Sequence, residues 1–153
     1  MSINLEKDLC FVLMRFSRRL SRRVNFALRG LELTGEQVAM LDAIEAMPLP
    51  RGTDVRVALG LDPSTVSANL KPLLRQGLIV TFEDPVDHRA RRLQLSPEGR
   101  RRLRLAREIL LEIDSLVRGR LEERGVLKDI TSALNLMWSG LDEGKRLPEK
   151  TRS

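Results

Sequence analysis

Apolar residues recur at helical spacing along most of this chain. The first such segment covers about Leu5 to Arg29, where an apolar residue falls on every third or fourth position. Its stripe consists of Leu9, Leu13, Phe16, Leu20, Val24 and Ala27. Residues 9–14 are apolar on every side of the expected helix, a pattern typical of a helix that is buried all round. In a chain of 153 residues, a second subunit is the natural cover for such a helix.

Three shorter helices are expected next. The first starts with a capping box formed by Thr34 and Gln37, and prolines after Ala46 end it. Thr53 or Asp54 is expected to cap a short second helix that ends near Gly60. These signals predict two helices joined by a short break.

The third helix is marked by Asp62 as N-cap and Pro63 at its first position, where the missing N–H costs nothing. Its inward residues are expected to be Val66, Leu70, Leu73 and Leu74. Pro72 lies inside this helix and frees a carbonyl one turn back, so we expect a kink but no break.

A β-hairpin is expected after these helices. Residues 78–82 are short and rich in β-branched side chains, residues 91–95 alternate, and residues 83–90 form the loop between them. A long helix is expected from about Glu98 to Glu123, and a last helix from about Val126 to Glu143, with Trp138 in its apolar core.

Three helices followed by a two-stranded hairpin are the elements of a winged helix-turn-helix. The sequence therefore predicts a mainly α fold with a small antiparallel β-hairpin. Residues 33–97 form the winged lobe, and residues 1–32 and 98–145 form a helical dimerisation region. Residues 146–153 are expected to form a loose tail.

The distribution of charge along the chain indicates a function for this fold. The net charge is +6, and the whole excess lies in residues 1–104, which hold 18 Lys and Arg against 12 Asp and Glu. Residues 105–153 hold 9 of each kind. A basic part beside a neutral part suggests a polyanionic partner, and double-stranded DNA is the partner that a winged helix-turn-helix binds.

The helix at residues 62–76 is the candidate for entering the major groove. Its outward side chains are small and polar, which permits close approach to base edges. The expected DNA contacts on this helix are Ser64, Thr65, Ser67, Ala68, Asn69 and Lys71.

The wing is expected to place Arg89 in the neighbouring minor groove, with His88 and Arg91 also on DNA. Asp87 is predicted to pair with Arg89 and brace the loop, because a free acid at a phosphate surface would repel DNA.

On these motifs the chain resembles the MarR family of bacterial transcriptional regulators. LTGEQVAMLDAI is similar to the family's second helix, and LGLDPSTVSANLKPLLRQGLI to its recognition helix. DPVDHRARRLQLSPEGRRRL is similar to its wing, with Asp-x-Arg at Asp87 and Arg89, followed by the Leu-(Ser/Thr)-x-x-Gly that opens the dimerisation helix. The resemblance covers roughly Leu33 to Leu103. It implies a homodimer on a pseudo-palindromic operator, and usually repression that a small ligand or an oxidant relieves.

Two features of the first helix indicate whether a small ligand or an oxidant would relieve repression. Leu9-Cys10-Phe11 resembles the redox site of thiol-based organic hydroperoxide regulators, which would make Cys10 a peroxide sensor. Those regulators hold the thiolate with Tyr hydroxyls, and this chain has no Tyr, so the alternative is that Cys10 is a small core residue.

The first helix also carries a cationic face, which consists of Arg15, Arg18, Arg19, Arg22 and Arg23. Arg15 and Arg19 are candidates for an anionic or aromatic effector, with a solvated face as the alternative.

Other classes of function lack a signature here. There is no Gly-rich phosphate loop and no nucleophile motif, so neither an enzyme nor a cofactor is expected. His88 and Cys10 are too few for a metal site. The longest uncharged apolar run is too short to cross a membrane, and one Cys with a charged N-terminal segment predicts a cytoplasmic protein. The remaining alternative is a winged helix that binds protein, but the arginines of the wing favour DNA.

Overall fold

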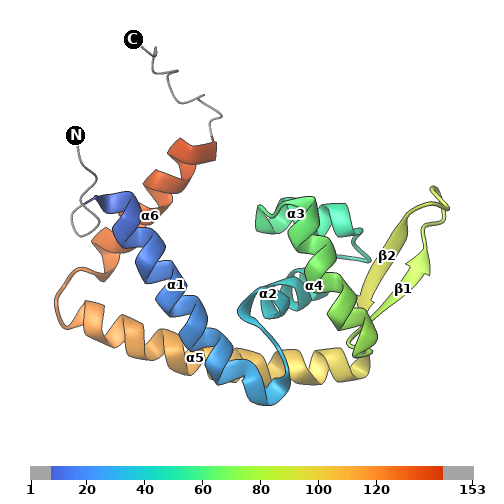
Figure 1. Ribbon diagram of the computed structural model, residues 1–153, viewed down its shortest axis with the longest axis horizontal. Helices are drawn as coiled ribbons and strands as arrows, with labels where there is room; N and C mark the ends of the chain where they lie inside the picture. The colour runs from blue at the N-terminus through green and yellow to red at the C-terminus, as the bar shows by residue number, and fades with distance from the viewer. Residues whose placement is uncertain (1–7, 143–153) are drawn as a thin grey trace, which may run out of the picture. The chain divides into compact units, whose positions relative to one another are not determined.

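The computed structural model describes residues 8–142, and the side chains of residues 8–137. Its elements are α1 (Leu9–Leu28), the 3-10 turn η1 (Arg29–Leu31), α2 (Gly35–Ala46), α3 (Gly52–Leu59), α4 (Pro63–Arg75), β1 (Ile79–Glu83), β2 (Arg91–Leu95), α5 (Pro97–Glu122) and α6 (Leu127–Asp142) (Figure 1). The described residues up to Leu111 form one compact unit, and those from Glu112 form a second.

The predicted fold class is confirmed: helices dominate and one antiparallel hairpin interrupts them. The capping box at Thr34 and the N-cap at Asp62 form as expected, and α4 continues through Pro72. Three expectations lie outside the described residues: the first turn near Leu5, the tail at 146–153 and the packing of Trp138.

The expected cap of α3 is wrong. The helix begins at Gly52, with Arg51 at the N-cap position, and Asp54 lies in its first turn. The Asp54 carboxylate accepts the backbone N–H of Arg51 at 2.7 Å. An acid in the first turn can reach back to the cap residue just as a cap side chain reaches forward, so the two arrangements share a sequence signature.

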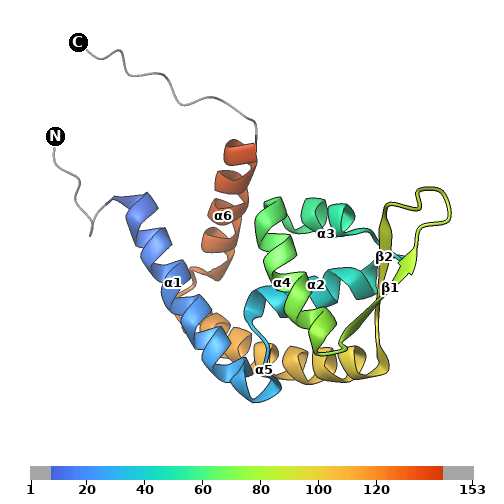
Figure 2. The same ribbon diagram turned by 45° about the vertical axis from the view of Figure 1, so that its right-hand side comes forward.

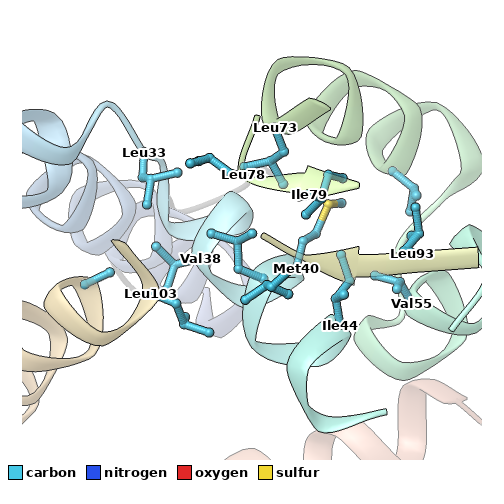
Figure 3. Packing of buried hydrophobic residues seen from close by; sticks show 14 of the residues in the cluster. Leu33, Val38, Met40, Ile44, Val55, Leu73, Leu78, Ile79, Leu93 and Leu103 are labelled. Carbon is cyan, nitrogen blue, oxygen red and sulfur yellow. The ribbon is translucent and has the colours of Figure 1, made fainter. Parts of the chain in front are cut away.

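The core lies in the first unit and joins α2 to every other element of the winged helix. Figure 3 shows the Met40 side chain of α2 reaching toward Ile79 of β1. The buried apolar residues are Leu28, Leu33, Val38, Met40, Leu41, Ile44, Val55, Val66, Leu73, Leu78, Ile79, Leu93, Leu95, Leu103 and Ala106. Leu74 was expected among them but is exposed, because α4 turns that side toward solvent beside α3.

The hairpin is anchored on one side to the segment before α3. Ile79 pairs with Leu95 and Glu83 with Arg91, and the loop between the strands projects away from the helices (Figure 2). The backbone N–H of Leu93 donates to the carbonyl of Pro50 at 2.8 Å. The wing is therefore fixed relative to α3.

The start of α5 rests on the loop that follows α4. The Ser96 hydroxyl donates to the carbonyl of Gly77 at 2.7 Å, and its oxygen accepts the backbone N–H of Gly99 at 3.0 Å. The serine in the Leu-Ser-x-x-Gly motif thus caps α5 and ties it to the end of α4.

Replacing Ser96 with alanine is expected to lower the free energy of unfolding by about 1 kcal/mol, because one cap N–H loses its acceptor. Thermal and urea unfolding followed by circular dichroism would measure the change. Ser96→Thr retains the hydroxyl and is expected to recover most of the loss. If Ser96→Ala unfolds like the parent, the capping role is wrong.

Candidate nucleic-acid interface

The start of α4 is fixed by the Asp62 carboxylate. It accepts the backbone N–H of Thr65 at 2.9 Å and the Thr65 hydroxyl at 2.6 Å, and it also accepts the Ser64 hydroxyl. These donors, the Ser64 hydroxyl foremost, hold the pKa of Asp62 well below its usual range. Asp62 therefore stays ionised and holds the first turn of α4 in one conformation.

The exposed face of α4 carries most of the residues expected to contact DNA. Ser64, Ser67, Ala68 and Lys71 are exposed, while Thr65 and Asn69 are half-buried. Small side chains at these positions leave room for a base edge to approach the helix backbone.

Asn69 differs from its neighbours because its amide is already used. Its Nδ2 donates to the Glu36 carboxylate and to the Thr65 carbonyl, both at 3.0 Å. An asparagine that reads adenine must donate a hydrogen bond as well as accept one. Asn69 ties α4 to α2 in this structure, and its contact with a base stays a prediction.

The base of the wing is held by Asp84, which the sequence reasoning did not single out. This side chain is fully buried and accepts the backbone N–H groups of Val86 at 2.9 Å and Asp87 at 3.1 Å. Two guanidinium groups close on the same carboxylate: Arg51 donates at 2.8 Å, and Arg92 also pairs with it. The backbone N–H of Val86 is the largest cause that holds the pKa of Asp84 well below its usual range.

Part of this arrangement has a sequence signal. An Asp followed by Pro at the end of a strand is typical of a turn in which the carboxylate accepts nearby backbone N–H groups. The approach of Arg51, 33 positions earlier in the chain, depends on tertiary packing and has no local signal.

The brace expected at Asp87 forms with a different group of Arg89. The Asp87 carboxylate accepts the backbone N–H of Arg89 at 3.1 Å and lies 3.9 Å from the Arg51 guanidinium. Within the described residues it makes no ion pair with the Arg89 side chain. The predicted pairing of the two side chains is therefore wrong, because Asp87 closes a local turn instead.

The three expected wing contacts are all exposed: His88, Arg89 and Arg91. Arg91 lies 3.6 Å from the Glu83 carboxylate, its cross-strand neighbour. The Arg89 side chain has no hydrogen bond or ion pair with any residue in the range 8–137. Its positive charge is thus the least compensated one on the wing.

Cys10 and Arg15 lie on α1, in the same unit as the winged helix. Cys10 is exposed and does not belong to the buried cluster of the first unit. Arg15 lines a hollow of about 360 Å³ together with Phe11, Arg18 and Arg22. Arg19 is exposed but does not line this hollow.

Within the described residues, no helix is both long and apolar enough to cross a membrane. In the same part of the chain, no group of three His, Cys, Asp or Glu side chains could hold a metal ion.

A buried three-helix core, a braced hairpin and an exposed polar α4 define a winged helix-turn-helix. Residues 31–90 match the sequence model of the MarR family. The matched stretch, which holds α2, α3, α4 and β1, is thus similar to the MarR family. A comparison with curated proteins gives no significant match.

Solved structures of similar fold cover nearly the whole chain. The regulator MosR of M. tuberculosis, in complex with DNA, is 21% identical over 92% of this chain and 100% of its own, with a TM-score of 0.77. The S. aureus MepR–DNA complex is 22% identical over 89% of this chain and 98% of its own, with a TM-score of 0.78. The regulator PcaV of Streptomyces coelicolor, with its natural ligand, is 26% identical over 88% of this chain and 96% of its own, with a TM-score of 0.70.

Proposed function

We propose that this protein is a cytoplasmic repressor that binds a pseudo-palindromic DNA operator as a homodimer and leaves it when a small effector binds. The observation that carries the proposal is the uncompensated charge of Arg89 on a wing that Asp84 fixes beside the exposed polar face of α4. In this proposal residues 33–97 bind DNA, and residues 1–32 and 98–145 form the dimer.

The contacts follow from the geometry of one lobe. With α4 in the major groove, Ser64, Ser67 and Ala68 face base edges, and the half-buried Thr65 and Asn69 lie behind them. The exposed Lys71 contacts DNA at the edge of this face. The wing then meets the adjacent minor groove, where Arg89 enters a region of concentrated negative potential. His88 and Arg91 lie beside it and contact phosphates.

The exposed apolar side chains of α1 support a homodimer. Leu9, Met14, Phe16 and Phe26 are each more than half exposed in the single chain. Large apolar side chains that cluster on one helix mark an interaction surface, since burying them removes an unfavourable contact with water. A two-fold dimer would then place two copies of α4 about one DNA turn apart.

The hollow on α1 supports an anionic or aromatic effector. Phe11 offers an aromatic surface, while Arg15 and its two neighbouring arginines offer charge. Arg19, outside the hollow, is the weaker candidate. The likeness to PcaV, solved with its natural ligand, supports release by a small molecule.

Oxidation of Cys10 is a second candidate signal, which the exposure of this thiol favours. A sulfenic acid formed on an exposed α1 could disturb a dimer interface. Loss of DNA binding after one equivalent of an organic hydroperoxide, in the parent but not in Cys10→Ser, would support this signal over the small effector.

A protein-binding wing is the competing function. Val86 is 87% exposed and Phe82 47% exposed, and exposed apolar side chains are what such a wing requires. The salt dependence of binding separates the two functions, because only phosphate contacts release counterions from DNA.

Replacing Arg89 with alanine is expected to weaken operator binding by about 1–3 kcal/mol, roughly 5- to 150-fold. The slope of log affinity against log salt is also expected to fall, by about one per subunit, wherever Arg89 neutralises a phosphate. Fluorescence anisotropy at several salt concentrations measures both. Arg104→Ala, an exposed arginine on α5, is the matched control. If Arg89→Ala binds DNA with the affinity and the salt slope of the parent, the wing is not part of the DNA interface.

A further inference from the structure

A hollow of about 420 Å³ lies between α3 and α4. Its apolar lining includes Val66, Leu70 and Leu74. Its polar lining includes Arg56 and Thr53 from α3 and Lys71 from α4. We call this feature the α3–α4 groove.

Within the described residues, no acid pairs with the two cations that line the groove. Arg51 and Arg92 share Asp84, Arg102 pairs with Glu98, and Arg107 pairs with Asp42. The side chains of Arg56 and Lys71, in contrast, make no hydrogen bond or ion pair with any described residue. No acid lines the groove either. Two positive charges on one hollow repel each other, so an anion bound between them would be stabilised by both.

The place of the groove indicates which anion it binds. Ser67 and Lys71 line it and also belong to the exposed face of α4. The groove is thus continuous with the surface that is proposed to lie on DNA, and the phosphates nearest to that surface belong to the DNA backbone. Because Lys71 and Leu74 are exposed, a free small anion would stay largely hydrated here, whereas neighbouring contacts hold a DNA phosphate in place.

We propose that the α3–α4 groove binds one phosphate of the operator backbone together with its deoxyribose. The Arg56 guanidinium donates to the phosphate oxygens in a planar fork, Lys71 adds a point charge, and the Thr53 hydroxyl donates a further hydrogen bond. The apolar lining packs against the sugar. The assignment rests on the proposed DNA binding and adds α3, through Arg56 and Thr53, to the interface.

The test compares DNA binding by the parent and by Arg56→Ala. Binding is measured by fluorescence anisotropy over a range of salt concentrations. A phosphate contact carries no sequence information, so we expect about fivefold weaker binding to operator and unrelated DNA alike. The salt slope should fall by about one per subunit. Arg56→Lys keeps the charge and should keep the slope. Arg104→Ala removes an exposed arginine of α5, outside the groove and outside residues 33–97, and is the control.

Thermal unfolding of each variant shows whether it folds. An unchanged salt slope in a folded Arg56→Ala overturns the proposal, as does weakening confined to operator DNA. Excess sodium benzoate at constant ionic strength tests a free carboxylate: release of the parent but not of Arg56→Ala would make that anion the occupant and overturn the proposal too. If the parent protein binds no DNA, the proposed function is wrong. If the parent binds DNA and Arg56→Ala binds it equally well, only the proposal for the groove is wrong.

Discussion

Gly99→Ala is expected to lower the free energy of unfolding by about 3 kcal/mol, because a Cβ at this position has no space. An ideal Cβ would lie 2.0 Å from the carbonyl oxygen of Leu78 and 2.9 Å from its carbonyl carbon. Both are backbone atoms, so no side-chain rotation relieves the clash. Leu78 cannot easily retreat, since it is fully buried and its carbonyl accepts the backbone N–H of Ser96 at 3.0 Å.

The measurement is thermal and urea unfolding, and a fall in melting temperature on the order of 10 °C is expected for a chain of this size. Gly30→Ala is the matched control, because a Cβ there meets nothing within 4 Å. We expect its change to stay within about 0.5 kcal/mol. Equal stability of the two variants would show that the close approach of α5 to Leu78 is wrong.

Asp84→Asn is expected to separate the wing from α3 and to weaken DNA binding about tenfold, the equivalent of one lost groove contact. An amide of the same size cannot neutralise two guanidinium groups, and it offers an N–H to Arg51 and Arg92, which themselves only donate. The wing would keep its sequence, including Arg89, but lose its fixed position. Anisotropy with operator DNA measures the effect, and Asp42→Asn, which removes an exposed partner of Arg107, is the control.

The same variant changes the pH dependence of stability. Folding lowers the pKa of Asp84, so the unfolded chain takes up the proton first as the pH falls. The stabilisation from Asp84 is therefore complete above the ordinary carboxyl pKa near 4 and is lost progressively below about pH 4. Glu98, whose pKa Arg101 and then Arg102 lower to about 2, contributes in the same direction. Stability should fall less steeply below about pH 4 in Asp84→Asn than in the parent, and equal slopes would contradict the role of this carboxylate.

The order of elements could be predicted from the sequence because each boundary has a local cause. The capping box at Thr34, the Asp62-Pro63 pair and the alternation of residues 91–95 depend only on neighbours in the chain. The predicted start of α3 was wrong because Asp54 reaches back from the first turn to accept the backbone N–H of Arg51 and does not cap a later N–H. The predicted burial of Leu74 was wrong because helical spacing does not distinguish a residue at the edge of an apolar stripe from one at its centre.

The candidate interface was less predictable, because its details depend on contacts between distant segments. The sequence marks Arg89 as basic, but only the fold shows that its charge has no partner among the described residues, whereas Arg51 and Arg92 pair with Asp84. Likewise, the contact of Asn69 with Glu36 joins residues 33 positions apart. Residue type indicated which side chains could bind DNA, and tertiary structure decides which of them are available.

Sequence-specific DNA binding is tested most directly by fluorescence anisotropy. The probe is DNA from immediately upstream of the gene for this protein, with unrelated DNA of equal length as competitor. The account predicts tight binding that the competitor does not displace and that weakens steeply with added salt. Equal binding to a panel of promoter fragments and to unrelated DNA, with no preference for any sequence, would contradict it.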